Sequence, residues 1–167
     1  VLPRFTAEAC EAVTGIADAA ALLAEAERGQ LFLVPLDAER RWYRYHHLFA
    51  DVLRHRLISG VSADMVAALH RRASGRYAQQ GLVAEAVQHG LSAADGAWVA
   101  DLIEQHGLRL IVGGQIHTVL RWLHALPDVL VGVRPMLCTI HALALLFTNA
   151  LNAAEARLQD AERGIVA

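Results

Sequence analysis

The sequence predicts a mainly α-helical protein, in which a partial winged helix with one β-hairpin precedes antiparallel helical hairpins of a tetratricopeptide-like solenoid. Two short segments, 31–36 and 41–45, flank a polar turn, as in a β-hairpin; the first is apolar and includes the β-branched Val34, and the second alternates and is aromatic. The other segments carry apolar residues at helical spacing. Helix-breaking turns recur from Gly81 to Gly114 and on to Leu151, in steps of 33 and 37 residues, close to the length of a helix–turn–helix repeat.

Residues 1–59 have the element order helix, helix, hairpin, helix, which is that of a winged helix without its first helix. Thr6 is a good N-cap for a helix that ends before Gly15. Asp18 is expected to cap a second helix, which Gly29 closes at its C-terminal end. The apolar stripe of this second helix, which we expect to be buried, consists of Leu22, Leu23 and Ala26.

The predicted hairpin joins segment 31–36, whose Pro35 suits an edge strand, to the alternating segment 41–45. The polar turn between them runs from Asp37 to Arg40. A helix is expected to resume at His46, with one apolar side made of Leu48, Phe49, Val52, Leu53 and Leu57.

From residue 62 to residue 167 the sequence predicts helices only, as expected of a helical repeat region. Ser62 and Gly81 bound a first long helix, and segment 82–93 is its expected antiparallel partner. Asp95 starts another helix, which the pair Gly113-Gly114 ends. The remaining predicted helices are 115–127, 135–147 and 152–166, and Pro127 and Pro135 bracket a predicted loop.

The composition excludes several classes of protein. The chain of 167 residues is 55% hydrophobic, but none of its apolar runs approaches the ~18 residues of a membrane-spanning helix. The sequence starts with neither the segments of a signal peptide nor a methionine, so we expect a cytoplasmic piece of a longer protein. The chain contains no lysine, which excludes a Walker-type phosphate loop and a Schiff-base mechanism within these residues.

The distribution of charge does not favour nucleic-acid binding. The formal net charge is −2, and residues 1–60 contain seven arginines against eight carboxylates. The arginine pairs at 40–41, 54/56 and 71–72 are interleaved with carboxylates, and the candidate recognition helix, 18–28, is acidic. We therefore expect no direct DNA contact by this chain and no membrane contact.

His46 and His47 stand where the hairpin is expected to meet the next helix. The first turn of a helix has unpaired N–H groups and a partial positive charge, so it attracts anions. An imidazole there can donate a further hydrogen bond to a phosphate oxygen. The alternative is that one of these histidines packs in the core while its neighbour faces solvent.

The other chemically active side chains do not predict a metal or catalytic site. His117 and His124 lie two helical turns apart without a third ligand at suitable spacing. The remaining histidines are isolated, namely His55, His70, His89, His106 and His141. Cys10 and Cys138 match no metal or redox spacing and have no identifiable base, so we expect buried thiols. We expect no enzymatic activity from these residues.

Segments 1–15, 22–57, 69–95 and 114–127 together resemble, in order, the middle of the large MalT-type regulators of the LuxR family. The most specific part of the resemblance is the wing segment, 22–57. Such regulators are similar to STAND-class signalling ATPases, which place a nucleotide-binding domain, a winged helix, a helical repeat sensor and a C-terminal helix-turn-helix in series.

The resemblance places Tyr45-His46-His47-Leu48 on a motif that reads methionine-histidine-aspartate in related ATPases, where the histidine contacts the β-phosphate of ADP in the resting state. It therefore implies a cofactor-binding role for His46. His47 stands where those relatives carry aspartate, so only His46 inherits a role.

The function implied by the resemblance is that of a non-catalytic regulatory and sensor region. The winged helix, residues 1–59, would respond to ADP or ATP on an upstream nucleotide-binding domain of the same protein. The helical repeat region, residues 62–167, would receive an inducer or a partner protein. No cofactor is expected on these residues alone. The competing hypothesis is a helical-repeat interaction scaffold without a nucleotide role.

Overall fold

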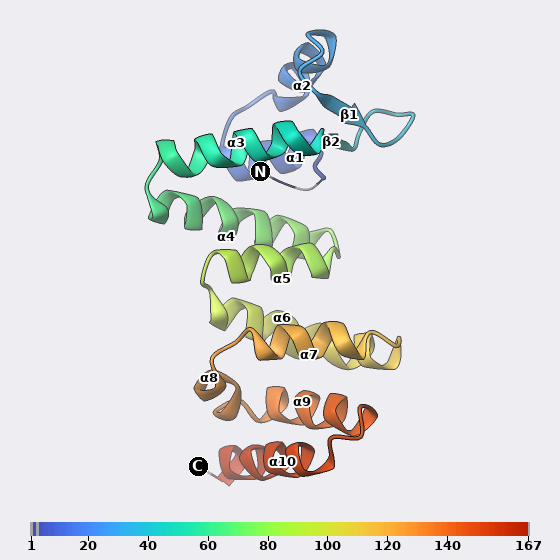
Figure 1. Cartoon of the computed structure of the whole chain (residues 1–167), viewed down its shortest axis with the longest axis vertical. Helices are drawn as coiled ribbons and strands as arrows, with labels where there is room; N and C mark the ends of the chain where they lie inside the picture. The colour runs from blue at the N-terminus through green and yellow to red at the C-terminus, as the bar shows by residue number, and fades with distance from the viewer. Residues whose placement is uncertain (1, 3, 167) are drawn as a thin grey trace. The chain divides into compact units, whose positions relative to one another are not determined.

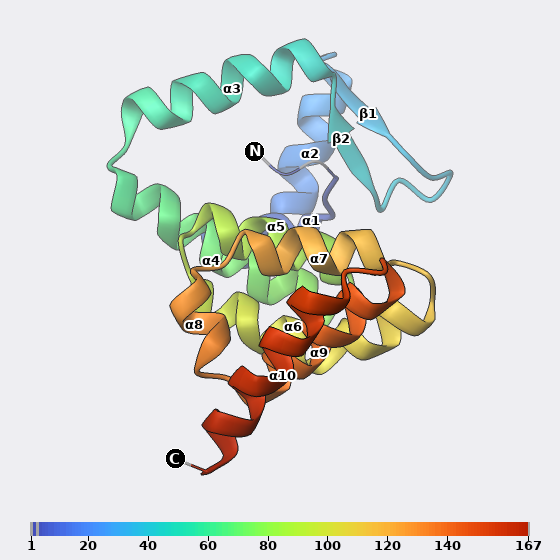
Figure 2. The same ribbon diagram turned by 60° about the horizontal axis from the view of Figure 1, so that its bottom comes forward.

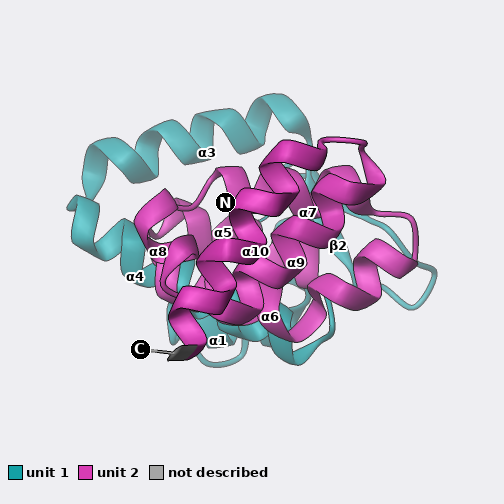
Figure 3. Ribbon diagram, turned by 90° about the horizontal axis from the view of Figure 1, so that it is seen from below, with its two compact units in different colours: residues 1–82 teal, residues 83–167 magenta. Residues whose placement is uncertain are grey.

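The computed structural model describes residue 2 and residues 4–166 (Figure 1). It divides into two compact units, Val1–Leu82 and Val83–Ala167, which are coloured separately in Figure 3. The predicted fold class is confirmed, because the described elements are helices apart from one antiparallel hairpin. None of the described helices is both long and apolar enough to cross a bilayer.

The first unit is built around a small sheet and the helices that cover it. Its elements are α1 (Ala7–Thr14), α2 (Ala19–Arg28), β1 (Leu33–Pro35), β2 (Tyr43–Tyr45), α3 (His47–Gly60) and α4 (Ala63–Gln79). The strands pair Leu33 with Tyr45 and Pro35 with Tyr43. Phe5 adds a bridge to Tyr43, with backbone N–O distances of 2.8 and 2.9 Å. The core on this sheet consists of Phe5, Ala9, Leu23, Leu33 and Tyr43.

The N-termini of α1 and α2 are capped in different ways. As predicted, the Thr6 hydroxyl caps α1 by accepting from the Ala9 N–H at 3.3 Å. The predicted cap of α2 is wrong: Asp18 has a φ of 62° and makes no capping bond. The Glu11 carboxylate from α1 accepts the Ala19 N–H instead, at 3.0 Å. A side chain eight residues upstream therefore supplies the cap.

Two further local predictions about the first unit were only partly right. Gly29 closes α2 as predicted, but it is the C-cap with a φ of −77°, and the left-handed C′ position falls on the next residue, Gln30, with a φ of 52°. In the predicted apolar stripe of α2, Leu23 is buried but Leu22 is 51% exposed. The helix is short and contacts the sheet along one narrow line, so only one of its two adjacent leucines is buried.

Helix α3 differs most from the sequence prediction, because none of its residues is buried. Leu48 and Val52, expected on a buried side, are 65% and 62% exposed. Figure 2 shows α3 leaving the hairpin and running apart from α1 and α2 along most of its length. The helix has the apolar side that the sequence predicts, but the described part of its own unit covers that side only in part.

Helix α4 belongs structurally to the first unit. It lies against α1, where the Arg72 guanidinium donates to the Val13 carbonyl at 3.3 Å. The hydroxyl of the buried Tyr77 donates to the Arg4 carbonyl. The compact unit therefore ends at residue 82, beyond the predicted division between 1–59 and 62–167. The assignment of those two ranges to a winged helix and a repeat region stays a prediction.

The second unit is entirely helical where it is described. It contains α5 (Val83–Ser92), α6 (Gly96–Val112), α7 (Ile116–His124), α8 (Asp128–Gly132), α9 (Pro135–Phe147) and α10 (Leu151–Val166). The predicted loop between Pro127 and Pro135 was wrong, because α8 occupies it. Gly107 lets α6 approach α9 closely, since an added Cβ would lie 3.0 Å from Cγ2 of Ile140.

Candidate functional site

The candidate site is His46, whose backbone is fixed on both sides. Its N–H donates to the Phe32 carbonyl at 2.8 Å, and its carbonyl accepts from the Ala50 N–H at 2.9 Å. The residue is the N-cap of α3, and its side chain makes no capping hydrogen bond. An exposed imidazole is thus attached to a well-anchored backbone at the start of a helix.

His47 is the first residue of α3 and is also exposed. The two imidazole rings lie beside each other, with centroids 4.3 Å apart and planes inclined by 34°. Neither histidine packs in the core of the first unit, so the alternative in which one of them is a core residue does not hold. Both side chains are exposed to solvent at the start of α3.

Aromatic side chains attach the first turn of α3 to the hairpin. The Phe49 ring lies 5.3 Å from that of Phe32 and 5.8 Å from that of Tyr45, measured between centroids. Phe32 has a φ of 55° and is 60% exposed. With Leu48 and Val52 it gives α3 an apolar surface close to His46, which we call the α3 surface.

The chemistry of the site fits one part of a phosphate-binding site. Because no side chain caps α3, its first-turn N–H groups are available to an anion, and the imidazole of His46 adds a donor. The chain has no lysine and no phosphate loop to surround a phosphate completely. A nucleotide bound here would need its remaining contacts from residues outside this chain. No group of three metal-ligating side chains occurs among the described residues.

The structure brings together one histidine pair that spacing alone did not predict. His124 of α7 and the buried His141 of α9 lie with ring centroids 5.5 Å apart. Burial lowers the pKa of His141 to about 4, and the nearby charges of Arg157 and His124 act in the same direction. His117, although on the same helix as His124, is exposed and takes no part in this contact. The pair is nonlocal, so no motif in the sequence reveals it.

The arginines and cysteines offer no site of their own. Arg40 pairs with Glu27 at 3.5 Å and Arg41 with Asp37 at 3.5 Å, so carboxylates neutralise the basic turn of the hairpin. Burial raises the pKa of the Cys10 thiol to about 11. Cys138 is buried and its thiol donates to the Val131 carbonyl at 3.2 Å. Both thiols are therefore poor nucleophiles near neutral pH.

A family model, the MalT winged helix domain, matches residues 1–65. This part of the chain is similar to the winged helix domain of MalT. The match includes the hairpin, His46 and the whole of α3. The resemblance to MalT-type regulators that the sequence predicted is thereby confirmed.

Curated proteins extend the similarity beyond the winged helix. The chain is 38% identical over 169 residues to serine/threonine-protein kinase PknK of Mycobacterium tuberculosis, covering 97% of this chain and 15% of the kinase. It is 27% identical over 162 residues to the HTH-type transcriptional regulator MalT of Vibrio parahaemolyticus, covering 97% of this chain and 18% of that regulator. The MalT of Vibrio cholerae is 28% identical over 142 residues, or 85% of this chain and 16% of the regulator. The chain thus spans less than a fifth of the length of each of these relatives.

Proposed function

We propose that this chain is a regulatory part of a MalT-type protein, in which the winged helix senses ADP or ATP on a nucleotide-binding domain of the same protein. The observation that carries the proposal is the exposed imidazole of His46, held by its backbone at the uncapped start of α3. In this role His46 donates a hydrogen bond to a phosphate of ADP in the resting state. The helical repeats receive an inducer or a partner protein. Exchange for ATP or inducer binding releases the resting state.

The α3 surface supports a contact with another domain. Phe32, Leu48 and Val52 are each at least 60% exposed. The Phe32 carbonyl is bonded to the His46 N–H, and Leu48 and Val52 lie on the helix that His46 caps. Exposed apolar side chains beside a candidate ligand contact are typical of a surface that another part of a protein covers. The nucleotide-binding domain is the partner that this proposal assigns to it. The chain itself performs no catalysis; any ATPase activity belongs to that domain, and the protein works in the cytoplasm.

Replacing His46 by alanine in the full-length protein tests the proposal. Loss of one hydrogen bond to a charged phosphate is expected to weaken ADP binding by roughly 10- to 100-fold. Bound ADP should dissociate faster in a chase with unlabelled nucleotide, and transcription without inducer should rise. His47→Ala is the matched control, since the side chain is equally exposed in the same turn. Unchanged ADP retention in His46→Ala would favour an interaction scaffold without a nucleotide role.

The isolated chain should not bind DNA directly. Ion pairs neutralise Arg40 and Arg41 in the turn of its hairpin, and α2 exposes Glu25 where a recognition helix would need basic side chains. We expect no shifted band with duplex DNA in a gel assay at low salt. A shift that weakens steeply as salt is raised would instead assign the winged helix a direct role in DNA binding.

A further inference from the structure

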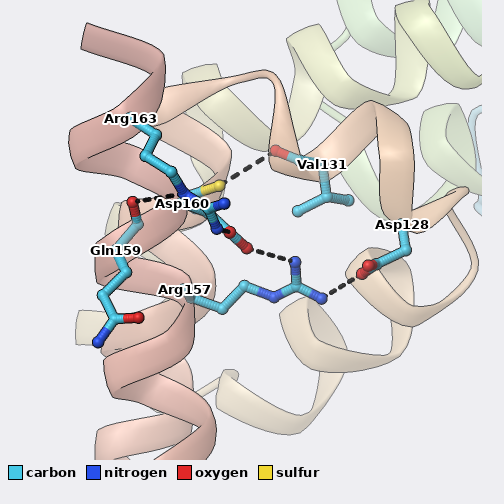
Figure 4. Close-up of polar contacts among 7 residues, drawn as sticks. Asp128, Val131, Arg157, Gln159, Asp160 and Arg163 are labelled. Atoms are coloured by element: carbon cyan, nitrogen blue, oxygen red, sulfur yellow. Dashed lines mark hydrogen bonds and ion pairs between the residues drawn. The ribbon is translucent and has the colours of Figure 1, made fainter. Parts of the chain in front are cut away.

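Helix α10 is held firmly on one side. Its Ala154 and Ala161 are 1% and 5% exposed where the helix packs along α9. An added Cβ on Gly164 would lie 3.0 Å from Cγ of Pro135, so the helices are in close contact there. Figure 4 shows Arg157 bonded to Asp128 of α8 and to Asp160 of its own helix. These contacts fix the orientation of α10 in the second unit.

Another edge of α10 carries apolar side chains that remain exposed. Leu151, Leu158 and Ile165 are 59%, 43% and 74% exposed. Because they recur every seven residues, they lie along nearly one line of the helix. We call these three residues the α10 stripe. Leu146 and Phe147, at the end of α9 before the turn into α10, are also exposed, at 46% and 62%.

The α10 stripe is accompanied by negative charge. Glu155 and Glu162 are exposed and stand three or four positions from the stripe residues, so they are neighbours on the helix surface. Neither forms an ion pair with another described residue. The arginines of α10 are engaged elsewhere: Arg157 with Asp128 and Asp160, and Arg163 with Asp160.

This charge argues against a second copy of the chain as the occupant. In an antiparallel pair centred on Leu158, Glu155 of one copy would approach Glu162 of the other. In a parallel pair Glu162 would approach Arg157 of the other copy, which Asp128 and Asp160 already engage. Like charges disfavour the antiparallel arrangement, and the parallel one offers the glutamates no unengaged cation.

We propose that the α10 stripe binds an amphipathic helix of a partner protein, with apolar residues at heptad spacing flanked by arginine or lysine. The leucines and isoleucine bury the apolar face of that helix, and Glu155 and Glu162 pair with its basic flank. The proposal deepens the partner-binding role of the helical repeats proposed above. It does not depend on His46, which lies in the first unit.

The test uses the whole chain and two synthetic helical peptides about three heptads long, identical except for arginine or glutamate at the flanking positions. Fluorescence anisotropy should show binding of the arginine peptide only, with an affinity that falls as salt is raised. Leu158→Asp should weaken binding by at least about tenfold. Leu108→Asp is the matched control, because Leu108 on α6 is 41% exposed against 43% for Leu158.

A charge-reversed chain keeps the test decisive. With Glu155→Arg and Glu162→Arg together, the preference should switch to the glutamate peptide. Equal binding of both peptides, or no binding of the arginine peptide, would overturn the proposal. A dimer of the chain in sedimentation that Leu158→Asp abolishes would assign the stripe to self-association instead. The His46→Ala variant should bind the arginine peptide as tightly as the parent chain. A loss of peptide binding can therefore be distinguished from a loss of the nucleotide role.

Discussion

Replacing Tyr77 by alanine is expected to lower the free energy of unfolding by about 3–5 kcal/mol. Tyr77 is 1% exposed and is the largest fully buried side chain of the described chain. The substitution leaves a cavity and removes the hydroxyl that donates to the Arg4 carbonyl. Urea denaturation followed by circular dichroism measures the loss as a lower transition midpoint.

Two companion variants separate the causes of this loss. Tyr77→Phe keeps the ring and removes only the hydrogen bond, so it should cost about 1 kcal/mol. Val52→Ala, at a 62% exposed position of the same unit, should change stability by less than about 0.5 kcal/mol. If Tyr77→Ala were as mild as Val52→Ala, Tyr77 would not be the central packing residue that its burial indicates.

Stability should also fall as the pH is lowered from about 6.5 to about 4, because of His141. Burial and the charge of Arg157 hold the pKa of this imidazole near 4 in the folded chain, below its ordinary value of 6.5. The unfolded state therefore binds the proton first, and folding loses free energy as the pH falls through this range. The difference between the two pKa values corresponds to about 3 kcal/mol at most.

His141→Leu isolates this contribution. Both ring nitrogens of His141 are buried without a hydrogen-bond partner among the described residues, so leucine should leave the stability at pH 7 equal or higher. The same variant should lose less stability between pH 6.5 and 4 than the parent chain. His117→Leu, an exposed position in the same unit, serves as the control. Identical pH profiles for the parent and His141→Leu would show that His141 accepts a proton freely in the folded chain.

Features that depend on short-range chemistry could be predicted from the sequence. Ser62 and Asp95 were expected to start helices, and their side chains accept from the N–H groups of Met65 and Trp98, at 3.3 and 3.2 Å. Gly81 and Gly114 were expected to break helices, and they have φ values of 73° and 82°. These caps and left-handed turns involve residues within four positions of one another, so the local sequence contains their cause; the cap of α2, which Glu11 supplies from eight residues upstream, does not follow this rule.

Features that depend on distant partners could not be predicted in this way. The Phe5–Tyr43 bridge and the His124–His141 contact join different elements, and no local pattern marks them. The exposure of Leu48 depends on which described elements pack against α3, not on the apolar character of the residue. The position of the candidate site at the hairpin–helix junction followed from residue order alone. Its nucleotide role rests on the resemblance, because half of such a contact would lie in another domain.

The two backbone hydrogen bonds of His46 have a mechanical consequence. One ties the residue to Phe32, just before β1, and the other ties it to Ala50, inside α3. Neither bond includes a flexible side chain that could absorb a displacement. A force that displaces the His46 backbone would therefore act on the hairpin and on the first turn of α3 together.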